Sequence, residues 1–218
     1  MTVLLVLAMI AFFLGLDWAI HRRQRRTAAL ATVPASEAGP LRLPAGVFFA
    51  RSHTWLNLFP SGRAWLGVDD FVARLLERPR VELLARPGSR VERGQALFAL
   101  VEGDHRLTVR SPLAARVVAV NPHVAAGGPR RAAGPFFEGW VFELEPERAA
   151  DLKSLLIGEE TAGWIRAELA RLRDVLAGAG PALGPAALQD GGLPVAGAMR
   201  HVGPEVWSRF EREFLTVE

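Results

Sequence analysis

Residues 93–120 read RGQALFALVEGDHRLTVRSPLAARVVAV. The run 96–101 is apolar and rich in strand-forming side chains, and the polar residues 102–105 that follow contain one glycine, as a short hairpin loop does. Strand character resumes at 107–109, stops at Ser111-Pro112 and returns at 116–120. Strands this short must pair with neighbours, so the stretch predicts the middle of a small all-β domain.

The wider region 47–145 continues this pattern. Gly and Pro recur at short intervals, which is typical of short strands joined by turns. Five apolar residues at helical spacing predict one short helix within 68–76. Residues 122–134 have no core pattern and predict a loop, and the aromatic residues of 136–142 predict a final strand. Alternating side chains would bury one face of the sheet around a small barrel-like core.

The order of several short motifs in this region resembles the glycine cleavage system H protein, of the lipoyl/biotinyl-domain family. In chain order, the motifs are Ser52-His53-Thr54-Trp55, residues 62–69 followed by a helical turn at 71–76, residues 87–94, Ser111-Pro112 with 117–121, and residues 138–141. The resemblance implies that residues 47–158 form a mainly β, lipoyl-domain-like barrel-sandwich hybrid with short flanking helices.

One departure from the family bears on activity. The resemblance implies that a lysine at the hairpin tip carries lipoate through an amide bond, which requires a primary amine. Counting back from Ser111-Pro112 puts Asp104, or a neighbour among Glu102, Gly103 and His105, at that position. The chain's one lysine is Lys153, in a later helical stretch. We therefore expect a degenerate lipoyl position, no bound cofactor and no carrier activity.

The N-terminal segment has the pattern of a membrane anchor. Residues 2–16 are almost wholly apolar, and about 20 such residues cross a bilayer, so we expect a transmembrane helix at 1–21. Arg22, Arg23, Arg25 and Arg26 follow it, which favours a cytoplasmic location for the rest of the chain and contact with anionic lipid. A buried helix and a cleaved signal peptide are the alternatives. Residues 22–46 predict this basic flank and a linker.

The C-terminal part, 159–218, predicts a helical extension beyond the usual end of the family. Helices are expected at 146–156, ended by Gly158, at 159–176, and at 204–215, with a Gly/Pro/Ala-rich segment at 178–194. The last helix carries Trp207, Phe210 and Phe214 on one face. That face predicts a docking surface for a partner, and packing back onto the β domain is the equal alternative.

Most catalytic chemistries lack their residues here. Without cysteine there is no thiol catalysis or thiolate metal site, and the five histidines are scattered along the chain without metal-ligand spacing. No nucleophile elbow or phosphate-binding glycine loop occurs. The net charge of +3 is mild, with no dense arginine block in the β region, so nucleic acid is not an expected partner. We therefore do not expect an enzyme, and no metal site is predicted.

Three functions follow as hypotheses. The first is a single-pass, inner-membrane protein whose cytoplasmic lipoyl-type domain is a non-enzymatic interaction or scaffold module for another protein. The second is a true lipoyl carrier of the glycine cleavage system or a related lipoate pathway, which would have to use Lys153. The third is a membrane-fusion-type transport adaptor, which would need an extracytoplasmic domain. Such adaptors usually carry a long hairpin insertion, and the short segment 102–105 leaves no room for one.

Overall fold

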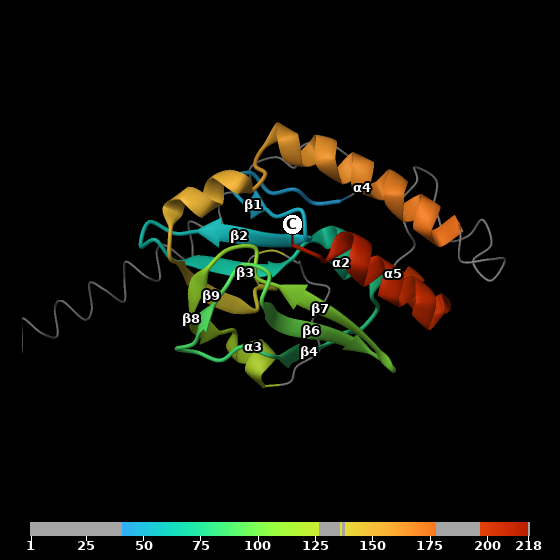
Figure 1. The fold of residues 1–218 in the computed structure, drawn as a ribbon, viewed down its shortest axis with the longest axis horizontal. Helices are drawn as coiled ribbons and strands as arrows, with labels where there is room; N and C mark the ends of the chain where they lie inside the picture. Colours follow the sequence, from blue (N-terminus) through green and yellow to red (C-terminus); the bar gives the residue numbers. More distant parts are fainter. Residues whose placement is uncertain (1–40, 127–135, 137, 178–196, 218) are drawn as a thin grey trace, which may run out of the picture. The chain divides into compact units, whose positions relative to one another are not determined.

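The computed structural model describes residues 41–126, 136, 138–177 and 197–217 (Figure 1). Two antiparallel sheets form the body of this part of the chain. The larger has the strand order β1-β2-β3-β9-β8-β5 and the smaller has β4-β6-β7. The strands are β1 (Phe48–Phe49), β2 (Thr54–Leu58), β3 (Ala64–Val68), β4 (Arg80–Leu83), β5 (Arg90–Val91), β6 (Ala96–Glu102), β7 (His105–Arg110), β8 (Ala115–Val120) and β9 (Phe142–Pro146).

Short helices surround the sheets. They are α2 (Asp70–Leu75), α3 (Pro122–Ala125), η1 (Ala149–Ser154) and η3 (Ala198–His201), and the longer helices are α4 (Glu159–Ala177) and α5 (Pro204–Phe214). The predicted mainly β domain with short helices is confirmed. The described part also confirms helices close to 68–76, 159–176 and 204–215.

The two sheets enclose the core through their inner side chains. Leu97, Phe98 and Leu100 of β6 are fully buried, and the ring of Phe98 lies 6.1 Å from that of Phe142 in the larger sheet. In β2, three consecutive residues from Thr54 to Leu56 are buried. Consecutive residues of a strand point to opposite faces, so β2 is covered on both sides.

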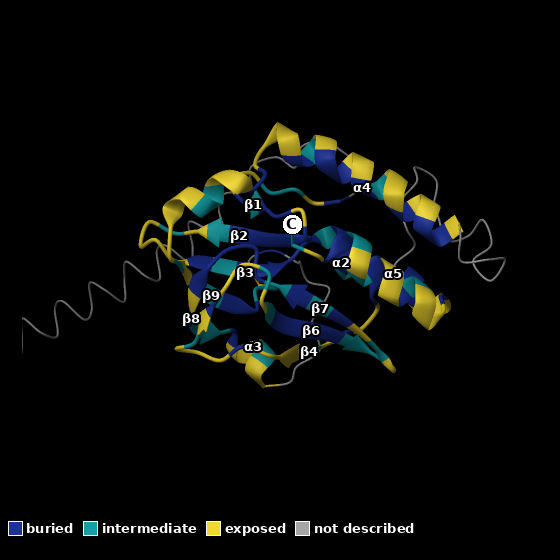
Figure 2. Ribbon diagram, viewed as in Figure 1, coloured by how far each residue is buried: buried dark blue, intermediate teal, exposed yellow. Residues whose placement is uncertain are grey.

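The helices α2, α4 and α5 cover the domain near β2. Asp69 begins α2 as its N-cap, because its carboxylate accepts a hydrogen bond from the backbone N–H of Val72 at 3.1 Å. Figure 2 shows that α4 and α5 each turn one buried face inward and one exposed face outward. Buried residues of both helices belong to the same hydrophobic cluster as those of the sheets. The extension is therefore part of the domain's core.

Two predicted elements are shifted in the structure. The final strand was expected at 136–142 but β9 runs from Phe142 to Pro146, and the helix expected at 146–156 is the short 3-10 helix η1. The reason for the first shift is alternation: Phe142 and Leu144 are buried and pair with Leu66 and Ala64, while Glu143 and Glu145 point outward. The strand β4 was not predicted, because its side chains are mostly exposed and give no apolar pattern.

The predicted membrane and linker segments lie largely outside the described residues. The span 1–21 is not described, and no helix in the described part is both long and apolar enough to cross a bilayer. The predicted linker 22–46 is described from Leu41 onward. Leu41 is buried in the core, and the backbone N–H of Arg42 donates to the carboxylate of Asp70 at 3.1 Å. The folded domain therefore begins by Leu41.

Candidate functional site: the tip of the β6–β7 hairpin

The strands β6 and β7 form a hairpin that ends in a two-residue turn. Their last paired residues are Glu102 and His105, so Gly103 and Asp104 make the turn. Gly103 has a φ of 60°, and a glycine with positive φ at the first central position is what a type II′ turn requires. The sequence prediction of a hairpin at 102–105 is confirmed.

The hairpin is buried at its base and exposed at its tip. Leu97, Phe98, Leu107 and Val109 are buried in the core, whereas Gly103 and Asp104 are exposed. Within the described residues, the carboxylate of Asp104 makes no hydrogen bond or ion pair. The turn thus presents one free carboxylate to solvent from a rigid base.

The residue before the turn is fixed by a hydrogen-bonded contact with the segment after α2. One carboxylate oxygen of Glu102 accepts from the backbone N–H groups of Glu77, at 2.9 Å, and Arg78, at 2.6 Å. Glu77 in turn forms an ion pair with Arg200 of η3. The hairpin is therefore tied both to the α2 region and, through Glu77, to the C-terminal extension.

The residue after the turn is held by α5. The ring of His105 stacks on Trp207, with ring centroids 4.7 Å apart. Trp207, Phe210 and Phe214 are only 3%, 0% and 1% exposed. Of the two alternatives for these three residues, the structure shows the second: the face packs back onto the β domain, where its rings have apolar and aromatic neighbours, among them Phe71.

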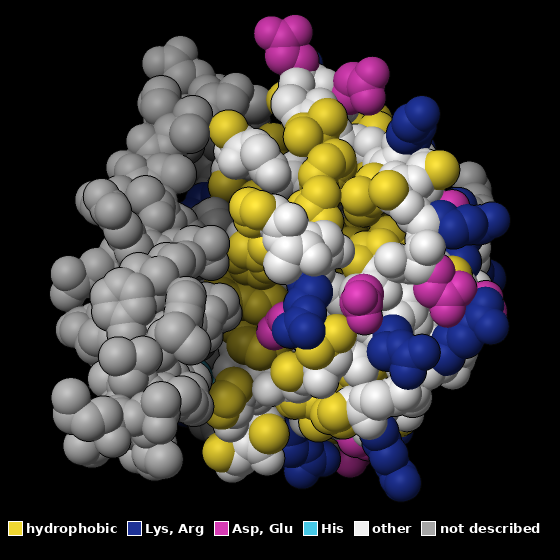
Figure 3. Space-filling model, turned by 90° about the vertical axis from the view of Figure 1, so that its left-hand side faces the viewer, with side chains coloured by type: hydrophobic (Ala, Val, Ile, Leu, Met, Phe, Trp, Pro, Cys, Tyr) yellow, Lys and Arg dark blue, Asp and Glu magenta, His cyan; other side chains and the backbone are white. Residues whose placement is uncertain are grey.

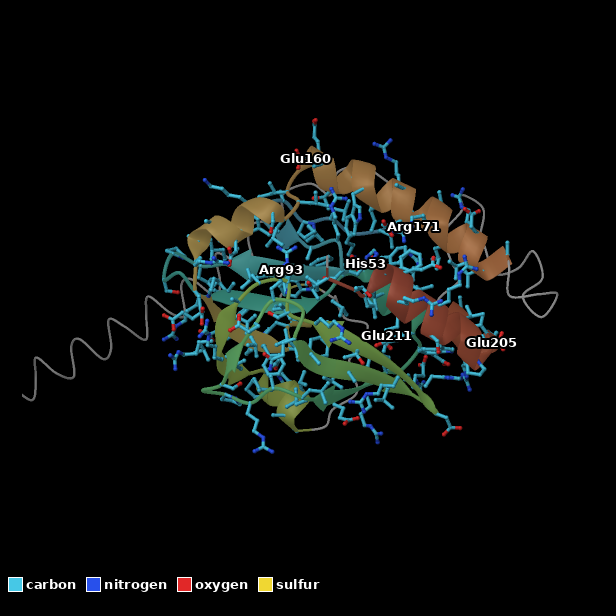
Figure 4. The ribbon with its side chains drawn as sticks, in the orientation of Figure 1. His53, Arg93, Glu160, Arg171, Glu205 and Glu211 are labelled. Carbon is cyan, nitrogen blue, oxygen red and sulfur yellow. The ribbon has the colours of Figure 1, made fainter. Side chains whose placement is uncertain are left out.

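A second group of polar residues lies buried beneath α4. His53 is fully buried, and its Nδ1 lies 2.8 Å from Oδ2 of Asp69. A carboxylate oxygen only accepts, so Nδ1 is the donor. The other ring nitrogen, Nε2, lies 3.7 Å from Oε2 of Glu168 on α4, too long for a hydrogen bond. Figure 4 places His53 on the side of the domain that α4 and α5 cover.

Glu168 extends this group to both C-terminal helices. Its two carboxylate oxygens accept from Nη1 of Arg171 at 2.8 and 3.0 Å. Arg171 also donates to the backbone oxygen of Glu213 at 3.0 Å and lies over the ring of Phe214. A chain of four side chains thus connects the β domain with α4 and α5, and their charges alternate in sign when the histidine is protonated: Asp69, His53, Glu168 and Arg171.

The charged neighbours in this group shift the pKa values of His53 and Glu168. Burial by itself lowers the pKa of His53, but the charge and hydrogen bond of Asp69 and the charge of Glu168 outweigh it, so the pKa lies above its ordinary value of 6.5. Burial raises the pKa of Glu168, but His53 and Arg171 outweigh it, and the pKa lies below its ordinary value. Both shifts favour the charged forms. Among the described residues, no cluster of three or more His, Asp or Glu could hold a metal ion.

The sequence matches one protein family over this region. The family model described as Glycine cleavage H-protein matches residues 47–168, more than half of the chain. The chain belongs to the glycine cleavage H-protein family. The resemblance seen in the sequence motifs is thereby confirmed.

Individual H proteins are similar at low identity. The glycine cleavage system H protein of Hydrogenovibrio crunogenus is 29% identical over 123 residues, 56% of this chain and 95% of that protein. The H protein of Methylococcus capsulatus is 30% identical over 117 residues, 54% of this chain and 91% of that protein. A crystal structure of an H protein from Mycobacterium marinum is 20% identical with a TM-score of 0.48, covering 56% of this chain and 97% of that one.

The H-protein match ends inside α4. Its last residue is Glu168, so Arg171, the second half of α4, η3 and α5 lie beyond it. The contacts of Trp207 with His105 and of Arg171 with Glu168 therefore join the extension to the H-protein region.

The only lysine of the chain lies away from the hairpin tip. Lys153 belongs to η1 and is exposed. In Figure 1, η1, drawn in gold before α4, lies at the opposite end of the domain from the β6–β7 turn. Of the predicted tip residues, the structure brings Glu102, Gly103, Asp104 and His105 together at one turn, and Lys153 is not among their neighbours.

Sequence reasoning missed the buried polar group. It treated His53 as part of a family motif and as one of five scattered histidines, included Asp69 only in the motif 62–69, and did not identify Glu168. A signal was present for Glu168: it lies four residues after Trp164 and four before Leu172, on the buried face of α4. A carboxylate on an apolar helix face indicates a buried partner.

Proposed function

We propose that this H-protein homologue is not a lipoyl carrier and works as a membrane-anchored, cytoplasmic binding or scaffold module. The observation that carries the proposal is the exposed Gly103-Asp104 turn, where the family resemblance implies an acceptor lysine. The carboxylate of Asp104 cannot form an amide with the carboxyl group of lipoate. The module has no catalytic role and no cofactor of its own.

The fixed flanks of the turn also support a binding role. The tip is exposed, yet Glu102 and His105 on either side are tied to the α2 region and to α5. A turn held on both sides presents one defined shape, and pre-organisation lowers the conformational cost of binding a partner protein.

An aromatic cluster on the outer face of the larger sheet supports a protein partner. The ring of Trp65 stacks on Trp140 at 5.1 Å, and Phe59 lies edge-on to Trp65 at 4.9 Å; all three are half-buried. Aromatic side chains are enriched in protein interfaces, and these three are partly accessible to a partner. On the face drawn in Figure 3, hydrophobic side chains form a band through the middle, with Lys, Arg, Asp and Glu side chains among them and around the edge. Nucleic acid is not a proposed partner.

The membrane anchor rests on the sequence of the N-terminal segment. Residues 1–21 would span the inner membrane once, with Arg22, Arg23, Arg25 and Arg26 on the cytoplasmic side in contact with lipid. A reporter fused at the C-terminus and active only in the cytoplasm is expected to be active. A reporter active only outside it would instead favour the transport-adaptor alternative.

Intact-mass spectrometry of the full chain tests the carrier question. The chain is co-expressed with a lipoate-attaching enzyme, and an H protein with an acceptor lysine serves as the control for enzyme activity. We expect no lipoyl adduct on the natural chain. The variant Asp104→Lys restores an amine at an exposed position that makes no folding contact, and it is expected to gain one adduct. The same adduct is expected when Asp104→Lys is combined with Lys153→Arg.

The result that would overturn the proposal is a lipoyl group on the natural chain. Because Lys153 is the only lysine, such an adduct would be absent from Lys153→Arg and would support the lipoyl-carrier alternative. If the natural chain stays unmodified, affinity capture from detergent-solubilised membranes identifies its binding partner. Comparing the Asp104→Lys and Trp65→Ala variants then shows whether binding of that partner requires the turn or the aromatic cluster.

A further inference from the structure

The contact between the H-protein region and α4 is centred on a fully buried histidine. Phe71 of α2 stacks on one side of His53 at 4.2 Å, and Trp164 of α4 lies 4.8 Å from it on a tilted plane. Phe214 of α5 is 5.9 Å away. His53 is in the left-handed backbone region, with a φ of 58°, which is uncommon for any residue other than glycine, although Asn, Asp and His adopt it more often than the rest. Its neighbours on three helices hold it there.

Only a doubly protonated ring satisfies both of its carboxylate neighbours. Nδ1 donates to Asp69, and Nε2 has no hydrogen-bond partner in the described part of the chain but faces Oε2 of Glu168 at 3.7 Å. In the neutral ring, the lone pair of Nε2 would face a carboxylate, and two buried acceptors would oppose each other. In the imidazolium, Nε2–H points toward the carboxylate and the four charges alternate in sign.

The charged groups around His53 are few in the described residues. Asp69 precedes α2, and α2 itself contributes Asp70, which accepts from the backbone of Arg42, and Arg74. Helix α4 contributes Glu168 and Arg171. Helix α5 contributes the Phe214 ring and, through the backbone oxygen of Glu213, an acceptor for Arg171. The proton on His53 therefore places a positive charge between the carboxylates of Asp69 and Glu168 at the centre of this contact.

We propose that His53 is a proton-controlled latch for α4: the helix is held closed on the H-protein region while the ring is an imidazolium, and it opens locally more often once the proton is lost. The opening would loosen the face of α4 that carries Trp164 and Glu168 from α2 and β2. The latch does not depend on the lipoyl question, since it involves neither the hairpin turn nor Lys153.

The direction of the pH dependence follows from linkage. Opening α4 takes Glu168 away from His53 and leaves Asp69 in place, so the pKa of His53 loses the part of its upward shift that Glu168 causes. Closure of α4 is therefore favoured while the ring is protonated, and it weakens as the pH rises through the pKa of the closed form. Between the pKa values of His53 in the open and closed forms, the opening equilibrium constant of α4 rises by up to about tenfold per pH unit, because one proton is released per opening at most.

Hydrogen–deuterium exchange of the full chain in detergent micelles tests the latch. Exchange of the amides in α4 is followed from about pH 5.5 to about pH 9, a range that includes the ordinary histidine pKa of about 6.5. The rates are corrected for the intrinsic exchange rate at each pH. We expect the opening constant of α4 to rise with pH, while that of the β6–β7 hairpin stays constant.

Two glutamate variants on the same helix make the test specific. In Glu168→Gln, the amide can donate to neutral Nε2 and still accept from Arg171, so the rise with pH is expected to disappear. Glu160→Gln, at the exposed start of α4 and away from His53 (Figure 4), is expected to keep the rise. The proposal is overturned if the natural chain shows no rise, if Glu168→Gln rises like the natural chain, or if the hairpin opens together with α4.

Discussion

The imidazole of His105 lies against the indole of Trp207, with planes 12° apart and centroids 4.7 Å apart. His105 directly follows the exposed turn of the β6–β7 hairpin, and Trp207 lies on the last helix, beyond the end of the H-protein match. The C-terminal extension is thus in contact with the element that the family resemblance makes the functional centre.

Truncating Trp207 should destabilise the domain strongly. Trp207→Ala removes a nearly buried indole and its stacking on His105, and such truncations cost about 3–5 kcal/mol. Trp207→Phe keeps a ring and should cost less than half of that. Urea unfolding of the full chain in detergent measures both. Arg212→Ala, exposed on the same helix, is the control and should change stability by less than about 0.5 kcal/mol. An equal loss in this variant would mean that the effect of Trp207→Ala does not come from its buried indole.

Removing the Glu102 carboxylate should loosen the base of the turn. Glu102→Ala leaves the N–H groups of Glu77 and Arg78 without their acceptor, a loss of about 1–3 kcal/mol. Glu102→Gln keeps a side-chain oxygen at the same place and should retain most of the stability. Thermal and urea unfolding compare the two variants. If the glutamine variant loses as much as the alanine variant, the hydrogen bonds to this oxygen are not what stabilises the contact.

Two glycines should respond in opposite directions to alanine. A Cβ at Gly67 in β3 would lie 2.8 Å from Nε1 of Trp55 and 2.9 Å from the backbone oxygen of Gly139, so Gly67→Ala forces a buried indole or a backbone to move. We expect a loss of about 1–3 kcal/mol, as for other overpacked cores. A Cβ at Gly163 in α4 meets nothing within 4 Å, and Gly163→Ala should stabilise by about 0.5–1 kcal/mol. Unfolding midpoints of both variants measure the contrast.

Neutralising Asp69 should move the alkaline loss of stability to lower pH. The raised pKa of His53 gives stability that is complete below 6.5 and is lost as the pH rises through the folded value. Asp69→Asn can still cap α2 by accepting from Val72, but it removes the charge that most raises the pKa of His53. The stability of this variant, measured by urea unfolding as a function of pH, should begin to fall at lower pH than that of the natural chain.

Asp70→Asn is the matched control for Asp69→Asn. Asp70 accepts from the backbone of Arg42 and does not contact His53. Its variant should leave the alkaline transition where it is in the natural chain. If both variants shift the transition equally, the effect comes from net charge in α2 and not from the contact of Asp69 with His53.

Sequence reasoning succeeded where the signal is local. The hairpin, its turn at Gly103-Asp104 and the helices near 68–76, 159–176 and 204–215 follow from alternation, helical spacing and turn residues, and all appear in the structure. It failed where exposure hides the pattern, as in β4, and where a strand carries two glutamates, as in β9. In both cases the neighbouring strand, and not the segment's own composition, fixes the conformation.

The sequence by itself determined which groups are available at the turn: an aspartate beside a glycine, in a chain with a single lysine elsewhere, and a family whose motifs occur in order. The type of each residue and the pattern of its close neighbours can be read from the chain without knowing which distant residues it contacts. Only the tertiary structure decided what Trp207, Phe210 and Phe214 contact, and that His53, Asp69 and Glu168 meet in the interior. An amphipathic face shows that a helix must cover something apolar, but which surface it covers depends on how segments far apart in the chain pack together.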